Sequence, residues 1–437
     1  MRSRHEHRHR FRRLSAAGSP RRRLRRAASG VVVLALGLGA ALVPAVAAQA
    51  DDIRSREYWL NDYGIAQAWN TTKGKGQTIA VIDSGVDPTH PDLVGAVVGG
   101  KDFSGFGGPT GQPAAGDDNE HGTMVASLAA GRGTGPDSGI IGAAPEASIL
   151  AVEIGFGSQA RNSDQQIADA VTWAVDNGAT VINMSFSRNT PDWPESWDKA
   201  FLYAMEHDVV IVAAAGNRGS GINSVGAPAT MPGVLVVGGV DRSGKSSFDA
   251  STQGITIGVS APSEELVGAT PGGGRAIWSG TSGASPIVAG IVALVKAAHP
   301  DLDAANVIER VVKTAHDAGT PGVDFLYGYG LVDASAAVSD KVPAVTKNPM
   351  GDLADWVRVY RRADGGAVAP ATRADRNPPA AVPVPTVPWS PVGTLLPDPR
   401  KLSGWGLPAA VLAGLIAVWF ALIAGGLRAV RSSRRTR

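Results

Sequence analysis

Three side chains have the types and the order that acyl-transfer chemistry needs. Ser282 lies among small residues in the stretch Gly280–Ala284, His121 follows a glycine-rich loop, and Asp83 ends an apolar run. A serine hydroxyl is a poor nucleophile until a base takes its proton, and a histidine base needs a carboxylate that orients it. The order Asp, His, Ser, with separations of 38 and 161 residues, supplies all three roles.

Each of these residues also has an ordinary structural explanation. Ser282 precedes the apolar stretch Ile287–Val295 and can cap a buried helix. A histidine at a helix start is more often a satisfied polar group, and an aspartate after a strand often forms a turn. Asn217 between glycines is typical of a turn, although its amide can donate to an oxyanion at a strand end. Taken singly, the residues leave these alternatives open.

Apolar runs that alternate with helical patterns must position these groups. Strands are predicted at Thr78–Asp83, Ser148–Val152, Val181–Met184, Val209–Ala215 and Val234–Val240. Helices are predicted at Met124–Ala130, Ser163–Asn177, Trp197–His207, Ile287–His299 and Asp303–Lys313. The alternation indicates βαβ units and a mainly parallel sheet, in which ligands bind at the carboxyl ends of the strands. Ser163 is the predicted N-cap of its helix, with Gln166 completing a capping box.

Composition and charge exclude several classes of protein. The 437 residues are 44% hydrophobic, which is enough for a sizeable core. The net charge of +2 conceals a basic N-terminus and an acidic body, because residues 51–427 hold 25 basic and 38 acidic residues. An acidic body argues against nucleic-acid binding. The absence of cysteine excludes disulfides, thiolate catalysis and cysteine-bound zinc, and leaves the redox compartment undecided.

The N-terminus has the pattern of a secretory signal peptide, predicted over residues 1–50. Residues 1–26 carry eleven arginines, Val31–Val43 is apolar, and Ala48-Gln49-Ala50 offers a small-residue cleavage site. An uncleaved N-terminal anchor is the alternative. Residues 51–72 are predicted to form an N-terminal extension that wraps the next domain, because they include four large aromatic side chains and are too few for a folded prodomain. These aromatic residues are Tyr58, Trp59, Tyr63 and Trp69.

The C-terminus predicts attachment to the cell membrane. Leu407–Leu427 is an uncharged apolar run of 21 residues, long enough to span the hydrocarbon core, and we place a transmembrane helix at residues 405–427. Five arginines in the tail 428–437 put that tail in the cytoplasm and the bulk of the chain outside, as a single-pass type I protein. Residues 346–404 are predicted to be a stalk, since Pro370–Pro399 holds nine prolines. A motif for a proline-binding partner is the alternative.

Several stretches in the right order resemble the subtilisin-like serine proteases, the subtilases or peptidase S8 family. The matching stretches are Ala80–Val86, His90–Leu93, His121–Ala126, Val181–Ser185, Ala213–Asn217 and Gly280–Ser282. The resemblance implies a three-layer α/β fold for residues 73–345, with helices on both faces of a mainly parallel sheet. It also implies that Ser282 attacks the scissile carbonyl, His121 moves the proton and Asp83 fixes the imidazole tautomer. The Asn217 side chain and the Ser282 N–H would hold the oxyanion.

The same resemblance implies a substrate-binding strand at Ser185, Phe186 and Ser187, where an extended peptide would pair with the backbone. It implies no cofactor. We assign no metal, since acidic loop clusters are usually solvated rather than calcium-binding. The acidic residues concerned are Asp117, Asp118 and Glu120. One departure from the family pattern is Gly283, where the family usually has methionine; this removes packing beside the nucleophile but no catalytic group.

The signal peptide, stalk, anchor and basic tail more narrowly resemble the mycosins, membrane-anchored subtilases of type VII secretion systems. This resemblance implies limited proteolysis of exported polypeptides and association with the secretion membrane complex. One alternative is a structural component of that complex whose proteolysis is dispensable. Another is an α/β-hydrolase-type esterase, which needs its acid and histidine after the serine, where only His299 and His316 occur.

Overall fold

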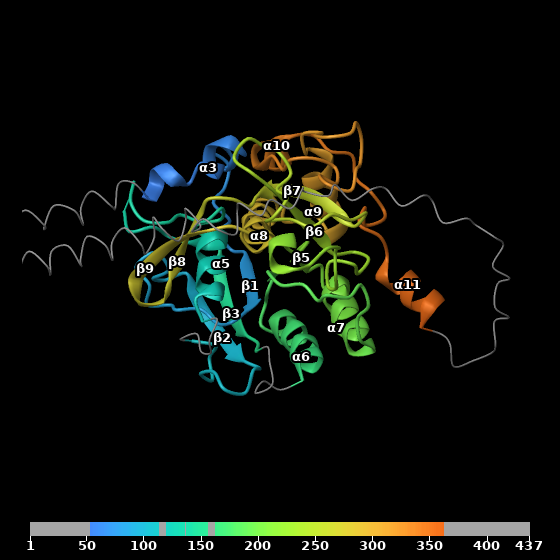
Figure 1. Cartoon of the computed structure of the whole chain (residues 1–437), viewed down its shortest axis with the longest axis horizontal. Helices are drawn as coiled ribbons and strands as arrows, with labels where there is room; N and C mark the ends of the chain where they lie inside the picture. The colour runs from blue at the N-terminus through green and yellow to red at the C-terminus, as the bar shows by residue number, and fades with distance from the viewer. Residues whose placement is uncertain (1–52, 113–118, 136, 156–161, 362–437) are drawn as a thin grey trace, which may run out of the picture. The chain divides into compact units, whose positions relative to one another are not determined.

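A computed structural model gives the structure of the central part of the chain (Figure 1). It describes residues 53–112, 119–135, 137–155 and 162–361. The predicted signal peptide 1–50, the transmembrane helix 405–427 and the tail 428–437 lie outside the described residues, as does most of the predicted stalk.

Seven parallel strands form the central sheet. In chain order they are β1 (Thr78–Asp83), β2 (Val97–Asp102), β3 (Ser148–Glu153), β4 (Val181–Met184), β5 (Val210–Ala214), β6 (Leu235–Val240) and β7 (Ile257–Pro262). In space the order is β2-β3-β1-β4-β5-β6-β7, so β1 lies between β3 and β4. The five predicted strands are confirmed within a residue or so at their ends. All the carboxyl ends meet at one edge, as parallel pairing requires.

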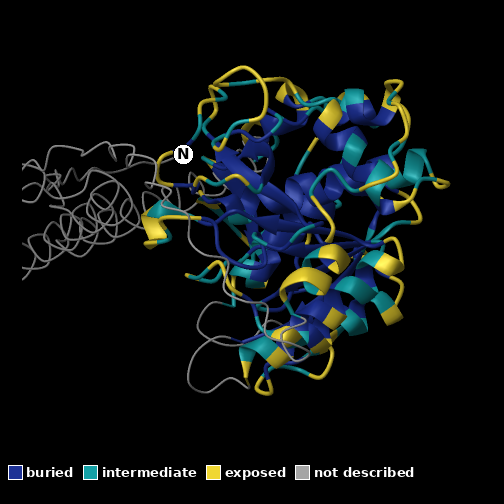
Figure 2. Cartoon of the chain, turned by 90° about the vertical axis from the view of Figure 1, so that its right-hand side faces the viewer, coloured by how far each residue is buried: buried dark blue, intermediate teal, exposed yellow. Residues whose placement is uncertain are grey.

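The strands read as continuous apolar runs because both faces of the sheet are covered. Alternate residues of β1 show this: Ile79 and Val81 belong to one buried core, whereas Ala80 and Ile82 belong to the other. Figure 2 shows the buried strands enclosed between partly exposed helices. Both faces therefore need helices, and the predicted α/β class with a layer on each side is confirmed.

Two groups of helices supply those outer layers. On one face lie α5 (His121–Ala130), α8 (Thr281–Ala298), α9 (Ala304–Lys313) and α10 (Ala334–Ser339). On the other face lie α6 (Ser163–Asp176), α7 (Glu195–Glu206) and α11 (Leu353–Tyr360). The 18-residue α8 is, among the described residues, long and apolar enough to cross a membrane, but 78% of it is buried in the protein. It is therefore the central helix of the core.

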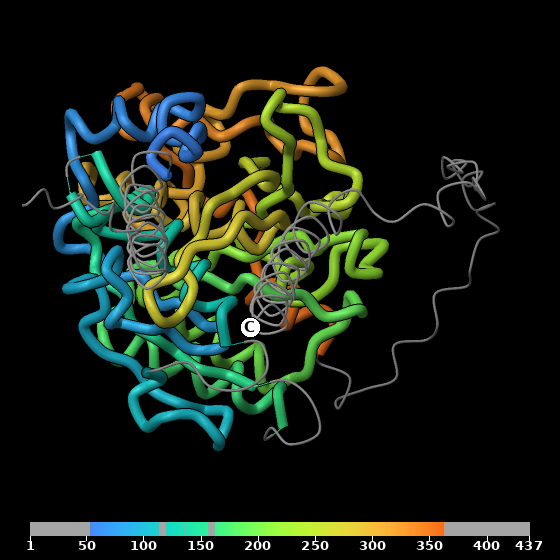
Figure 3. The backbone as a smooth tube through the Cα atoms, turned by 60° about the vertical axis from the view of Figure 1, so that its left-hand side comes forward, coloured from blue at the N-terminus to red at the C-terminus, as the bar shows by residue number. Residues whose placement is uncertain are grey.

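The N-terminal segment packs onto the domain, as its aromatic residues predict. It forms two short helices, α3 (Trp59–Asp62) and α4 (Ile65–Ala68), and Trp59 is fully buried. The Trp69 indole N–H donates to the Ala143 carbonyl at 2.9 Å, and the Tyr58 hydroxyl donates to the Glu264 carbonyl at 2.8 Å. Figure 3 shows this segment beside the chain's later part, consistent with the contact between α4 and α10. The N-terminal segment therefore contacts parts of the domain that come much later in the sequence.

Three features differ from the sequence predictions. Strands β2 and β7 were not predicted, and neither was an antiparallel hairpin of β8 (Leu266–Thr270) and β9 (Gly274–Trp278), because glycine and polar residues interrupt their apolar patterns. The N-cap of α6 is Asn162 rather than Ser163, since the Asn162 side chain accepts from the Asp164 N–H at 2.9 Å. Gln166 completes no capping box, because its buried amide bonds to both backbone groups of Gly155.

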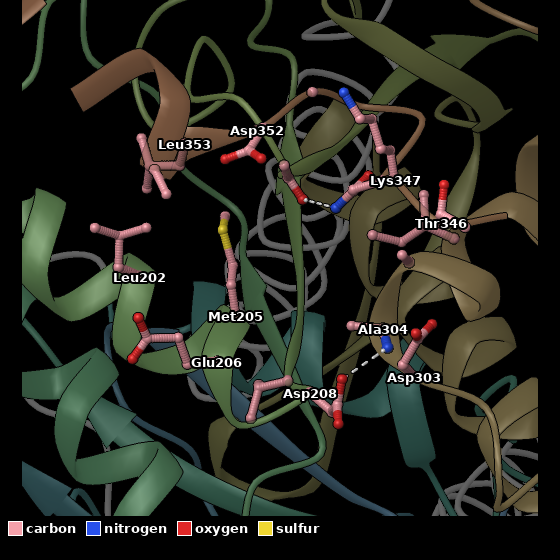
Figure 4. A pocket seen from close by; sticks show the side chains of 17 residues that line it. Leu202, Met205, Glu206, Asp208, Asp303, Ala304, Thr346, Lys347, Asp352 and Leu353 are labelled. Atoms are coloured by element: carbon pink, nitrogen blue, oxygen red, sulfur yellow. Dashed lines mark hydrogen bonds between the residues drawn. The ribbon is translucent and has the colours of Figure 1, made fainter. Parts of the chain in front are cut away.

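The third difference is at the C-terminal boundary. Helix α11 lies inside the segment predicted as stalk, and its N-cap Asp352 accepts from the Asp355 N–H at 3.0 Å. Leu353 is buried, and Arg361 bonds to Asp198 of α7 at 2.9 Å. Packing therefore continues past residue 345. Where this segment crosses the domain, it forms one wall of a cleft of about 300 Å³ (Figure 4). The residues that line the cleft include Leu202, Met205, Asp208, Asp303, Lys347 and Leu353.

Candidate active site

Asp83 and His121 form a hydrogen-bonded pair at the carboxyl end of β1. The His121 Nδ1 and the Asp83 Oδ1 atoms are 2.8 Å apart, and the same Oδ1 accepts the Ser84 N–H at 2.8 Å. The Asp83 side chain is 5% exposed and the His121 side chain 32%. A carboxylate that accepts from Nδ1 leaves Nε2 as the basic nitrogen. The pair therefore has the geometry of an oriented general base.

The residues after His121 explain why α5 begins at this point. The Gly122 N–H donates to the Ser84 hydroxyl at 3.1 Å, and a Cβ at Gly122 would lie 2.1 Å from the Gly85 carbonyl oxygen. The Thr123 hydroxyl accepts the Asp87 N–H at 3.0 Å. Gly122 and Thr123 thus contact the loop after β1, and His121 contacts the last residue of that strand. This docking brings the first residue of the helix to Asp83.

Ser282 lies in the first turn of α8 and pairs reciprocally with Ser185, just after β4. The Ser282 hydroxyl donates to the Ser185 carbonyl at 2.9 Å, and the Ser185 hydroxyl donates to the Ser282 carbonyl at 2.9 Å. Pro286 explains the second bond: it has no N–H, so the helix cannot satisfy the carbonyl four residues earlier. Proton transfer to His121 requires the Ser282 hydroxyl to turn away from Ser185. Such bonds commonly rearrange when substrate binds.

Asn217 follows β5 and lies against the start of α8. Its Oδ1 accepts the Thr281 N–H at 2.8 Å and the Thr281 hydroxyl at 2.9 Å. A backbone N–H can only donate, so the oxygen of the amide must face Thr281 and the Nδ2 group must face the other way. Gly280, with φ of 150°, comes close to that amide, since a Cβ there would be 3.0 Å from Nδ2. The orientation leaves two donors for an oxyanion beside Ser282, the Asn217 amide and the Ser282 N–H.

Of the predicted substrate-binding residues, Ser185 has the most fully defined contacts. Its hydroxyl also accepts from the Asn183 amide at 2.9 Å, and Asn183 accepts the Ser285 hydroxyl at 2.7 Å. This buried network joins β4 to α8. The Ser187 hydroxyl donates to the Arg188 carbonyl at 3.2 Å, and Phe186 lies partly buried against the core that α6 and α7 cover. The three residues follow β4 directly, at the same edge as Asp83.

Sequence reasoning missed the residues that support the site. Thr281, Asn183 and Ser285 orient the Asn217 amide and the Ser185 hydroxyl through buried hydrogen bonds. Polar side chains inside otherwise apolar stretches are the signal that points to them, because such groups need buried partners. Trp278, which contacts the ring of His121, gave no signal in the sequence. The acidic Asp117 and Asp118 lie outside the described residues.

The hairpin β8–β9 lies beside the site and is attached to the loop after β1. The Asp87 carboxylate accepts the Gly272 N–H at 2.8 Å, and His90 Nε2 bonds to the Gly274 carbonyl at 2.7 Å. Burial raises the pKa of the Asp87 carboxyl, but hydrogen bonds from Thr89 and from Gly272 outweigh it, so that pKa lies below its usual value. Arg275 binds Asp92 with two hydrogen bonds of 2.7 and 2.8 Å.

Comparison with known proteins identifies relatives over this domain. Residues 74–330 match the subtilase family. The chain is 40% identical over 264 residues to a thermophilic serine proteinase of Bacillus sp. (strain AK1), covering 60% of this chain and 62% of that protein. It is 36% identical over 285 residues to thermitase of Thermoactinomyces vulgaris, covering 65% of this chain and 96% of thermitase. The chain therefore spans less than two thirds of the Bacillus protein.

A solved structure extends the comparison. It is the serine protease MycP1, described as an essential component of the type VII (ESX-1) secretion system. This chain is 30% identical to it, with a TM-score of 0.56, over 64% of this chain and 88% of MycP1.

Proposed function

We propose a function for this chain on the premise that it belongs to the subtilase family of serine endopeptidases. It hydrolyses peptide bonds in polypeptides outside the cytoplasm, through an acyl-enzyme on Ser282. The observation that carries this proposal is the pairing of His121 with Asp83 at 2.8 Å, at the edge where Asn217 and Ser282 also lie. That edge holds a base with a fixed tautomer, a hydroxyl and oriented amide donors.

The mechanism assigns one step to each group. His121 Nε2 takes the Ser282 proton as the hydroxyl attacks the scissile carbonyl, and the imidazolium then gives that proton to the leaving amine. Asp83 stabilises the imidazolium through the bond to Nδ1. The Asn217 amide and the Ser282 N–H stabilise the oxyanion of each tetrahedral intermediate. Water attacks the acyl-enzyme by the reverse sequence of proton transfers.

The location and the physiological role are part of the same proposal. The apolar run Leu407–Leu427 with its arginine-rich tail supports a single anchor in the cell membrane, with the protease domain outside. The likeness to MycP1 supports a role in processing polypeptides exported by a type VII secretion system, with the secretion membrane complex as partner. No nucleic acid and no cofactor enter this proposal.

Labelling with a fluorophosphonate probe tests the chemistry. The full-length protein in membranes should be labelled, while Ser282→Ala and His121→Ala should not be. Ser339→Ala, at an exposed serine that ends α10 and has no role in the site, is the matched control and should keep labelling. Labelling of Ser282→Ala equal to the unaltered protein would refute Ser282 as nucleophile.

A structural role in the secretion complex is the second candidate, favoured by the description of MycP1 as an essential component of that system. The Ser282→Ala variant separates the two roles. Normal export with lost cleavage would make the scaffold role the essential one. Export that fails with this variant would make proteolysis essential.

An esterase of the α/β-hydrolase type is disfavoured. His299 lies at the far end of α8, about 25 Å from Ser282 at roughly 1.5 Å per residue, and its Nε2 bonds to the Val338 carbonyl at 2.7 Å. His316 bonds to Asp333 at 2.9 Å, near α10. Neither histidine after Ser282 is placed to serve as its base.

A further inference from the structure

A tryptophan of the β8–β9 hairpin reaches the catalytic histidine. Trp278 is the last residue of β9 and pairs with Leu266 of β8. Its ring and the imidazole of His121 are in edge-to-face contact, with centroids 5.7 Å apart and planes at 80°. The hydrogen bond to Asp83 fixes the position of Nδ1. The contact with the Trp278 ring then restricts rotation of the imidazole plane about that atom. Edge-to-face pairs of this kind are favourable beyond the area they bury.

Two glycines make the space that the indole occupies. A Cβ at Gly283 would lie 3.3 Å from Trp278 Cζ2 and 2.3 Å from the end of the Leu266 side chain. A Cβ at Gly268 would lie 2.8 Å from Trp278 Nε1 and 2.9 Å from the Met124 Cβ. Gly283 is the residue directly after the nucleophile, in the first turn of α8. A side chain there would displace the end of the Leu266 side chain and would crowd the indole.

The indole nitrogen shows what holds the ring in this position. Trp278 Nε1 is buried and has no hydrogen-bond partner among the described residues. Buried indole N–H groups normally find a partner, and leaving one unpaired is unfavourable. Hydrogen bonding therefore does not explain the ring's position, whereas packing between the two glycines and His121 does.

The hairpin itself is held before any substrate arrives. At its turn, Gly272 and Gly274 bond to Asp87 and His90 of the loop after β1, and Arg275 binds Asp92. Asp92 is fully buried, so this attachment is a part of the fold rather than a loose surface contact. The same loop leads from Asp83. Trp278 is thus carried by an element that is attached to the loop of the catalytic carboxylate.

We propose that Trp278 is a positioning residue that holds the His121 imidazole in the plane needed to receive the Ser282 proton, in a slot that exists because residue 283 is glycine. The inference rests on the proposed triad. It explains the departure at Gly283: the volume beside the nucleophile is filled by Leu266 of β8 and Trp278 of β9 rather than from α8. A misplacement of a catalytic group by about 1 Å can cost on the order of 100-fold in rate.

Steady-state kinetics on a peptide substrate test the proposal with two replacements of Trp278. Trp278→Leu should lower kcat by about 10-fold to 100-fold with little change in KM, and should shift the acid limb of the pH profile of kcat/KM, which reports His121. Trp278→Phe keeps an aromatic ring and should recover most of kcat and the original pH profile. Ile277→Ala, on the other face of the same strand and 52% exposed, is the control and should change neither.

A second pair of variants tests the slot and serves if Trp278→Leu fails to fold. Gly283→Ala should slow turnover, because its methyl group displaces the end of the Leu266 side chain and crowds the six-membered ring of the Trp278 indole. Adding Trp278→Phe, a smaller ring, should restore part of the turnover in the Gly283→Ala background, because it relieves the contact with residue 278 and leaves the one with Leu266. Strictly additive effects of the two substitutions would contradict a shared slot.

The outcomes separate this inference from the proposed function. If the unaltered protein neither cleaves peptides nor reacts with a fluorophosphonate, the proposed function fails. If the unaltered protein is active, and folded Trp278→Leu has the same kcat and the same pH profile, only the role of Trp278 is overturned.

Discussion

Two buried regions that both contain a carboxylate are built on different principles. At the carboxyl edge of the sheet, Asp83 accepts from His121 and from the Ser84 N–H, and Asn217 accepts twice from Thr281. In the N-terminal segment, Glu57 is enclosed beside Arg54, and burial raises its pKa to about 8. In the first region, the hydrogen bonds orient the imidazole of His121 and the amide of Asn217. The second is held mainly by apolar side chains such as Trp59, and its carboxylate is poorly accommodated when charged.

We infer from this difference that the sheet edge determines the rate of catalysis, whereas the N-terminal segment determines the stability of the fold. Changes at the sheet edge should alter rate with little effect on stability, because they reorient reacting groups. Changes in the N-terminal segment should alter the free energy of unfolding and leave turnover of the folded protein unchanged. Four substitutions, from the largest expected effect to the smallest, test this separation.

Asp83→Asn should lower kcat by roughly 10⁴-fold, since the amide imposes the wrong tautomer on His121. The melting temperature should change little, because the amide fills the same volume. Measured kcat and circular dichroism melting on one sample check both parts. A large drop in melting temperature with a small loss of kcat would reverse the roles of the two regions.

Asn217→Ala should lower kcat by about 10²- to 10³-fold with KM nearly constant, since the lost donor acts on the transition state. This magnitude is the one measured in subtilisin, a member of the same family. Single-turnover kinetics with a peptide substrate measure the effect. Arg218→Ala, the next residue along, is the control and should retain kcat.

Trp59→Ala should destabilise the domain by about 3–5 kcal/mol, because it empties a fully buried site of the largest side chain. Urea unfolding measures this loss. The folded fraction should keep the kcat of the unaltered protein. A loss of kcat at full folding would show that the N-terminal segment also shapes the active site.

Glu57→Gln should flatten the pH dependence of stability. With a pKa of 4.5 in the unfolded chain and about 8 in the folded one, the folded state holds the proton more tightly, so Glu57 stabilises fully below pH 4.5 and less as pH rises to about 8. Urea unfolding from pH 5 to 8 should show stability falling with pH, and a shallower fall in Glu57→Gln. Equal slopes would mean that Glu57 is not the group responsible.

The sequence predicts the reacting groups better than the residues and elements that position them. Asp83, His121 and Asn217 could be placed because each follows or precedes a strongly patterned element, and the strand of Asp83 ends at the predicted residue. The order of the strands and the glycine-rich hairpin β8–β9 could not be predicted, because they depend on pairing between distant segments. Trp278 meets His121 across 157 residues of chain, and one sequence contains no trace of that contact. Helix α11 was hidden because a proline-rich segment follows it closely.

Ser185 and Ser282 exchange hydrogen bonds, so the Ser282 hydroxyl already has a partner before any substrate binds. One hydrogen atom serves either the main chain after β4 or the imidazole, never both at full strength. A long peptide that pairs with that main chain competes for the Ser185 carbonyl as it binds, whereas a small reagent must wait for the Ser282 hydroxyl to rotate by itself. We therefore expect selectivity for extended peptides to arise partly because they release the Ser282 hydroxyl, and not only because they bind more tightly.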